Sequence, residues 1–184
     1  MALAVAVGIP LGTLMGRFRP VDEVFGLWVN VFVSAPLTAV VPVLMAILGF
    51  GQTTVITTVF LFAVWVIVLD TRAGIRSVNK SLIEMARSFG ASRFEIYRKI
   101  LLLAALPEIL AGIRLGLIRG VKGVVIGQLL IAVIGLGELF ELYSRNFLMA
   151  EFWALIITVF IFTFAVAEAV GFIEKRIEIY ASSR

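Results

Sequence analysis

The sequence predicts an all-α membrane protein, a polytopic bundle of about five spans of which the first is incomplete. Of its 184 residues 61% are hydrophobic, and the mean hydropathy is +1.10. A water-soluble domain of this size cannot bury that much apolar surface, so a lipid bilayer must solvate it. Long apolar stretches also alternate with short polar ones, and a single polar segment, residues 70–99, is longer than the rest.

Composition excludes several classes of function. The chain has no cysteine and no histidine, so we expect no disulfide, no thiol or imidazole catalysis, no metal site and no cofactor. It has no GxxxxGK[ST] phosphate loop, so any ATP that drives it is bound by another chain. The net charge is +4, but the basic residues are distributed by membrane side and not interleaved with aromatic residues, which argues against nucleic acid.

The first two apolar segments differ in length. Residues 2–15 would span only about 21 Å as a helix, too short for a hydrocarbon core of about 30 Å. Residues 25–48 are long enough for one crossing, and Pro36 and Pro42 within them each favour a kink. Such kinks often lie beside a transport pathway, which makes both prolines candidate pathway residues. A passive bent span explains them equally well.

Three further spans follow. Residues 53–69 sit at the lower length limit for a crossing. A helix over residues 107–132 begins at Pro107, whose missing donor would be unpaired there anyway, and ends before Ile134-Gly135. Residues 138–151 read as an external loop with a short amphipathic or re-entrant helix, and residues 152–172 as the last span, where Glu168 is expected to pair with Arg176. No internal repeat is found, so residues 1–184 are expected to form one domain.

The distribution of lysine and arginine predicts the orientation. Twelve of them lie in the polar segments on the side of residues 70–99, and only Arg145 lies on the other side. Cytoplasmic segments carry the excess of basic residues, so the long polar segment and the C-terminus are expected in the cytoplasm.

The long polar segment carries two helix-start signals. Ser81 with Glu84 and Ser92 with Glu95 both match the Ser-x-x-Glu capping box. Gly90 lies between them and is suited to the left-handed conformation that ends a helix. The first of the two helices has its apolar residues on one side, namely Leu82, Met85, Ala86 and Phe89. This side packs either on the chain's own spans or on a partner, and amphipathicity alone leaves both open.

The same segment resembles a family signature. Glu84-Met85-Ala86, then Gly90 and then Ile100 are spaced as in the E-A-A, three residues, G, nine residues, I-x-L-P loop of binding-protein-dependent ABC importer permeases. Met85 and Leu103 depart from the usual alanine and proline, whereas Pro107 matches a second proline frequent in the nitrate, sulfonate and taurine branch. The resemblance is strong over residues 68–128.

The resemblance implies a function. Glu84, Met85, Ala86, Phe89 and Gly90 would belong to a coupling helix that sits in a groove on an ATPase subunit. The partners would be two such ATPases on the cytoplasmic side, an extracytoplasmic binding protein and a second permease subunit, as a homodimer in the inner membrane. The substrate would be a small anion of the sulfonate, taurine or nitrate type, or alternatively a vitamin precursor. Family members usually have more chain before this point, so we expect an N-terminally truncated sequence.

Three cations lie inside the 107–132 helix. Arg114, Arg119 and Lys122 are about 10, 18 and 22 Å from Pro107 and fall within an arc of about 140°. A cation at that depth must face protein or water. Arg119 and Lys122 either line an anion pathway or pair with acids or carbonyls of neighbouring spans, while Arg114 reaches the cytoplasmic headgroups.

Two other functions are compatible with a membrane protein of this kind. An intramembrane enzyme would need polar catalytic groups converging near one membrane face, and no such cluster is visible in the sequence. A scaffold would recruit a cytoplasmic partner without moving a solute.

Overall fold

The computed structural model describes residues 1–131 and 135–182, with side chains placed up to Ala169 and at Gly171 and Phe172. All regular structure in these ranges is helical, so the expected all-α class is confirmed. The pairing of Glu168 with Arg176 and the break at Ile134 lie outside the described residues. The helices are α1 Ala2–Arg17, α2 Arg19–Ser34, α3 Leu37–Leu48, α4 Gln52–Ser77, α5 Lys80–Ser88, α6 Arg93–Glu95, the π-helix η1 Ile96–Leu101, α7 Leu102–Ala104, α8 Leu106–Ile131, α9 Leu136–Arg145 and α10 Met149–Ser182.

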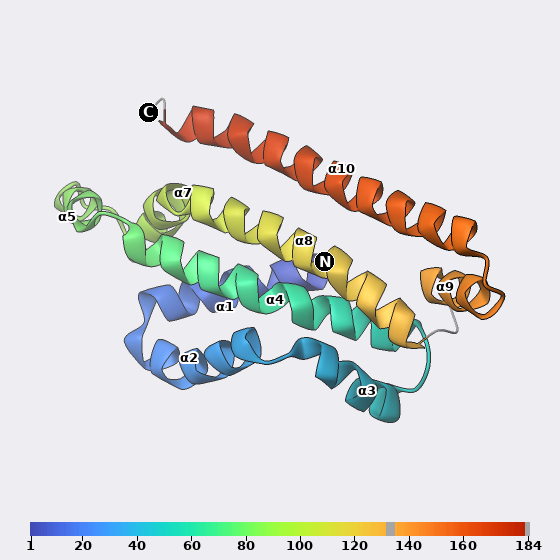
Figure 1. Ribbon diagram of the computed structural model, residues 1–184. Helices are drawn as coiled ribbons and strands as arrows, with labels where there is room; N and C mark the ends of the chain where they lie inside the picture. The colour runs from blue at the N-terminus through green and yellow to red at the C-terminus, as the bar shows by residue number, and fades with distance from the viewer. Residues whose placement is uncertain (132–134, 183–184) are drawn as a thin grey trace.

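Helix α4 is the centre of the bundle, with α1 and α8 packed along it (Figure 1). Both neighbours approach it through glycines. A Cβ added to Gly12 of α1 would lie 2.6 Å from the Val68 carbonyl oxygen, and one added to Gly116 of α8 would lie 2.8 Å from Ile67 Cγ1. Small residues at helical spacing let two backbones approach closely inside a membrane. The glycines that face α4 are Gly8, Gly12 and Gly16 on α1 and Gly112, Gly116, Gly120, Gly123 and Gly127 on α8.

The span expected over residues 25–48 is more strongly bent than a kinked helix. It consists of two helices, α2 and α3, which meet at a bend of 99°. Ala35 is extended because the residue before a proline is disfavoured in a helix, and Pro36 has no N–H to continue the ladder. Pro42, by contrast, lies within α3 without interrupting it. Helix α2 is held to α4 by stacking of Phe32 on Trp65, with ring centroids 4.6 Å apart.

Helix α4 is longer than the span expected at residues 53–69. It continues through Asp70 to Ser77, so the connecting segment begins at Val78 and not at residue 70. The charged residues remain helical because two of them find a partner on α2. Arg72 Nε lies 2.6 Å from one carboxylate oxygen of Asp22, and Arg76 Nη2 lies 2.5 Å from the other.

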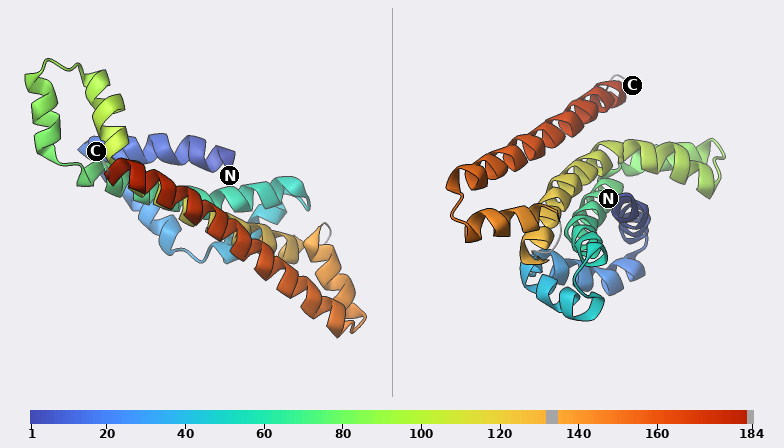
Figure 2. Two further views of the ribbon diagram at one scale, coloured as in Figure 1. Left: turned by 90° about the horizontal axis from the view of Figure 1, so that it is seen from above. Right: turned by 90° about the vertical axis from the view of Figure 1, so that its right-hand side faces the viewer.

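The membrane crossings agree with the expected bundle. Helix α4 and residues Met149–Ala169 of α10 are each long and apolar enough to cross a membrane. The pair α2 and α3 qualifies when taken as one bent span, as does Arg93–Ala104 with α8, which is bent by 60°. Helix α1 is a shorter apolar helix. Helix α10 lies to one side of the bundle in Figure 1 and in the right-hand view of Figure 2, and none of its most apolar stretch is buried.

Candidate functional site

The connection between α4 and α8 holds the residues expected to couple to a partner. Helix α5 begins with an Asn79 cap, whose side-chain oxygen accepts a hydrogen bond from the Ser81 backbone N–H at 3.0 Å. The capping box expected for Ser81 with Glu84 is therefore wrong, because Asn79 starts the helix and Ser81 lies inside its first turn. Glu84 is exposed on α5.

The second capping box is confirmed. The Ser92 hydroxyl accepts from the Glu95 backbone N–H, and the Glu95 carboxylate accepts from the Ser92 backbone N–H at 3.0 Å. The Glu95 carboxylate also accepts a hydrogen bond from Lys99 Nζ at 3.1 Å. These contacts fix the start of α6.

Gly90 ends α5 as expected. Its φ of 77° is in the left-handed region. The Ala91 N–H donates to the Ala86 carbonyl at 3.0 Å and the Gly90 N–H donates to the Arg87 carbonyl at 2.9 Å, the double hydrogen bond of a Schellman motif. The turn between α5 and α6 is thus fixed by the backbone and depends on a residue that tolerates positive φ.

The apolar side of α5 is divided between two surroundings. Ala86 is buried in a cluster formed by α4, η1 and α8, with Ile75, Ile96 and Ile109 among its members. Met85 and Phe89 are 54% and 85% exposed. Packing against the protein's own helices therefore covers one edge of the apolar side of α5 and leaves the other edge exposed. The coupling residues inferred from the sequence thus lie on α5 and its C-terminal turn but do not share one environment.

The four pathway candidates are not brought together. Pro36 caps α3 at the bend, and Pro42 is exposed on α3. Arg119 is half-buried and attracts Asp70 of α4 electrostatically, although no ion pair within 4.0 Å joins them among the described residues. Lys122 is exposed and lines an apolar groove of about 520 Å³ between α8 and α10. Arg114 lies against Gly171 of α10.

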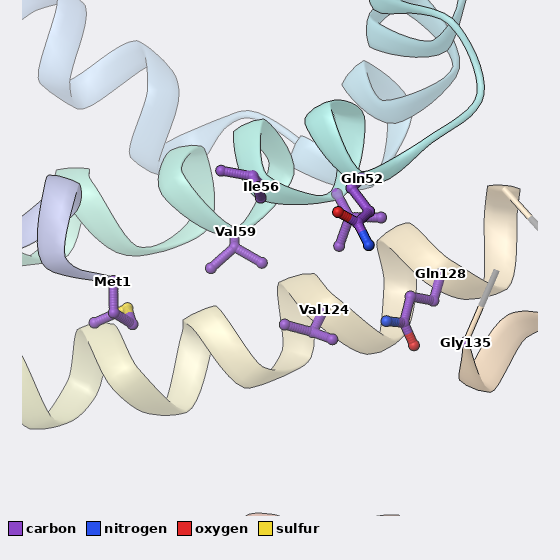
Figure 3. Close-up of a pocket in the computed structure, with 8 residues that line it drawn as sticks. Met1, Gln52, Ile56, Val59, Val124, Gln128 and Gly135 are labelled. Carbon is purple, nitrogen blue, oxygen red and sulfur yellow. The ribbon is translucent and has the colours of Figure 1, made fainter.

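A separate cavity of about 450 Å³ lies between α4 and α8 (Figure 3). The side chains of Gln52 and Gln128 reach it from the two helices, and its remaining wall is mainly valine and isoleucine. The side-chain amide oxygen of Gln128 accepts a hydrogen bond from the Leu136 N–H at 3.0 Å and so also holds the start of α9. Neither glutamine was predicted from the sequence, where the signal was a single uncharged amide beside or within an apolar stretch. Among the residues that the structure describes, no acidic cluster suited to a metal ion is found.

Comparison with known proteins gives the family. Residues 8–179 match the family of the binding-protein-dependent transport system inner membrane component. The chain belongs to this family. It is 34% identical over 136 residues to the glycine betaine/carnitine/choline transport system permease protein OpuCD of Bacillus subtilis, which covers 74% of this chain and 59% of that protein. It is also 34% identical over 134 residues to the taurine transport system permease protein TauC of Escherichia coli, covering 73% and 49%.

The chain spans between about half and three fifths of the length of these curated relatives. Among solved structures, it is similar to the inward-facing MetNI methionine ABC transporter with a TM-score of 0.76, over 95% of this chain and 87% of that one, at 21% identity. This likeness shows the fold. The resemblance drawn from the loop motif is thereby confirmed, and the family is one of inner-membrane transport components and not of enzymes.

Proposed function

We propose that this chain is the permease subunit of an ATP-driven importer, and that α5 transmits movement of an ATPase subunit to the spans. The observation that carries the proposal is the division of α5. Ala86 anchors the helix to α4, η1 and α8, while Met85 and Phe89 stay bare on a segment capped at both ends. Because α5 is rigid and packs against three other helices, a displacement of α5 by a partner would move all of them. Glu84 and Gly90 complete the docking segment.

The remaining partners follow from exposure and charge. The excess of Lys and Arg on the side of α5 supports a cytoplasmic site for two ATPases and for the C-terminus. A binding protein would deliver the solute on the opposite side. The bare apolar stretch of α10 and the exposed Lys122 support a second permease copy, because a cation at this depth is expensive against lipid.

The proposed cargo is a small anion of the taurine, sulfonate or nitrate type. Arg119 and Lys122 supply positive charge within α8, and similarity to TauC favours the same class. Similarity to OpuCD favours a second class, quaternary ammonium solutes, which the uncharged cavity of Gln52 and Gln128 would suit better than a cationic lining. Pro36 and Pro42 remain proposed pathway residues at the bend of α2 and α3.

Replacement of Gly90 tests the coupling role. Gly90→Val forces a β-branched residue into positive φ, at roughly 1–2 kcal/mol, and should lower uptake per ATP hydrolysed by about tenfold. No side chain would clash, since nothing lies within 4 Å of an added Cβ. Gly90→Asn is the matched control, because asparagine tolerates this conformation. The measurement is solute uptake and ATP hydrolysis in vesicles with the cognate ATPase and binding protein. Full coupling in the valine variant would contradict the assignment.

Replacement of the two cations tests the cargo. Two variants are compared, Lys122→Gln alone and Arg119→Gln combined with Lys122→Gln. Taurine uptake should fall about tenfold in both, and choline uptake should not fall, because each removed cation weakens attraction only for an anion. The melting temperature in detergent is measured on the same preparations, with Arg145→Gln as a control outside α8. A lower melting temperature with unchanged uptake per folded molecule would instead make the cations structural partners of acids such as Asp70.

A further inference from the structure

Helix α5 carries three different faces around its axis. At 100° per residue, Ile83 and Ala86 lie about 60° apart and point into the protein's own cluster. A second face carries the exposed apolar side chains Leu82, Met85 and Phe89. The third face carries Lys80, Glu84 and Arg87, all exposed. Lys80 and Arg87 lie about 10 Å apart along the axis and only about 20° apart around it.

We propose that the ATPase subunit receives α5 in a groove whose two walls differ in chemistry. One wall is apolar and meets Leu82, Met85 and Phe89. The other carries acids opposite Lys80 and Arg87, with a hydrogen-bond donor or cation between them for Glu84. This inference rests on the proposed function, in which α5 is the helix that docks on the ATPase, and it adds the chemistry of the surface that receives it.

The charged face is available for a partner. No ion pair within 4.0 Å holds Lys80, Glu84 or Arg87 among the described residues, although other exposed charges of the segment are paired, as in Lys99 with Glu95. The Asn79 cap and the Schellman turn at Gly90 fix the helix at both ends, so its faces keep a constant direction. Met85 and Arg87 lie about 160° apart around the axis, so the two walls face each other across the helix.

The two walls should act on different steps of docking. Complementary charges at the edge of an interface raise the association rate and set the orientation, and salt screens them. Apolar anchors that become fully buried govern mainly the dissociation rate. A helix docked in the reverse orientation would place Lys80 and Arg87 against the apolar wall, so the arrangement also specifies a single direction of docking.

The experiment measures binding kinetics between the permease, held in nanodiscs of neutral lipid, and its purified cognate ATPase subunit at several NaCl concentrations. Lys80→Gln with Arg87→Gln should lower the association rate about tenfold at low salt and flatten its salt dependence. Leu82→Ser with Met85→Ser should raise the dissociation rate about tenfold and leave the salt dependence intact. Arg93→Gln with Arg98→Gln removes the same charge from the following segment and should match the unaltered protein.

Three results would overturn the inference. One is salt-independent association of the unaltered protein with the ATPase. A second is an equal loss of association rate in the control Arg93→Gln with Arg98→Gln, which would show that the overall positive charge of the segment matters and not the charged face of α5. The third is an effect of Lys80 and Arg87 that appears only in nanodiscs with anionic lipid, which would assign these cations to the membrane. Failure of the proposed function looks different, since the unaltered permease would then not bind the ATPase at any salt concentration.

Discussion

Replacing Asp22 by asparagine is expected to lower the free energy of unfolding by roughly 3 kcal/mol, the low end of the range for breaking a buried ion pair. The Asp22 side chain is only 13% exposed and neutralises both Arg72 and Arg76. Without the carboxylate, two guanidinium groups near the C-terminal end of α4 face each other with no counter-charge. Arg76 is 44% exposed and can turn to water, which keeps the expected loss from being larger.

The measurement is unfolding of the purified protein in detergent by denaturant, followed by tryptophan fluorescence. Glu23→Gln is the control, because Glu23 is the neighbouring residue and its pair with Arg19 is exposed on both sides. An exposed pair contributes at most about 1 kcal/mol, so this variant should remain close to the unaltered protein. Equal effects of the two substitutions would show that the Asp22 pairs do not hold α2 on α4.

The second large effect is expected from Gly12→Val. A Cβ at Gly12 would lie 2.6 Å from the Val68 carbonyl oxygen and 2.7 Å from Thr71 Cβ, so α1 must move away from α4. Overpacking of this kind typically costs about 1–3 kcal/mol, and contact with backbone, which cannot rotate aside, places this variant at the upper end. The expected result is a lower melting temperature in detergent and a lower yield of folded protein.

Gly51→Val is the matched control for the glycine contact. Gly51 lies before α4, nothing lies within 4 Å of an added Cβ, and its φ of 168° is extended backbone open to any residue. This variant should melt within a few degrees of the unaltered protein. If Gly12→Val melted at the same temperature as Gly51→Val, the close packing of α1 on α4 would not contribute to stability.

Much of this structure follows from local chemistry that can be read in the sequence. The excess of apolar residues requires a bilayer, and the spacing of charges separates spans from connections. The turn at Gly90 and the cap at Ser92 were also predictable, because the backbone conformations that they need depend on residues only a few positions away. The family signature in the same segment indicated the family.

Other features depend on contacts between segments distant in the sequence. Asp22 and Arg72 are 50 residues apart, and their pairing explains why α4 remains helical past Asp70, where a polar stretch predicted a loop. The glycines on α1 and α8 have meaning only once α4 lies between them. The Asn79 cap was missed because a rival signal at Ser81 lay two residues away.

The sequence by itself determined the membrane class, the order of the helices and the family, because hydrophobicity, helix capping and a motif act over short stretches of chain. Only the tertiary structure decided which edge of α5 is buried at Ala86 and which is left bare at Met85 and Phe89. Amphipathicity shows that a helix has an apolar side, but the share of that side covered by its own protein depends on how α4, η1 and α8 pack around it.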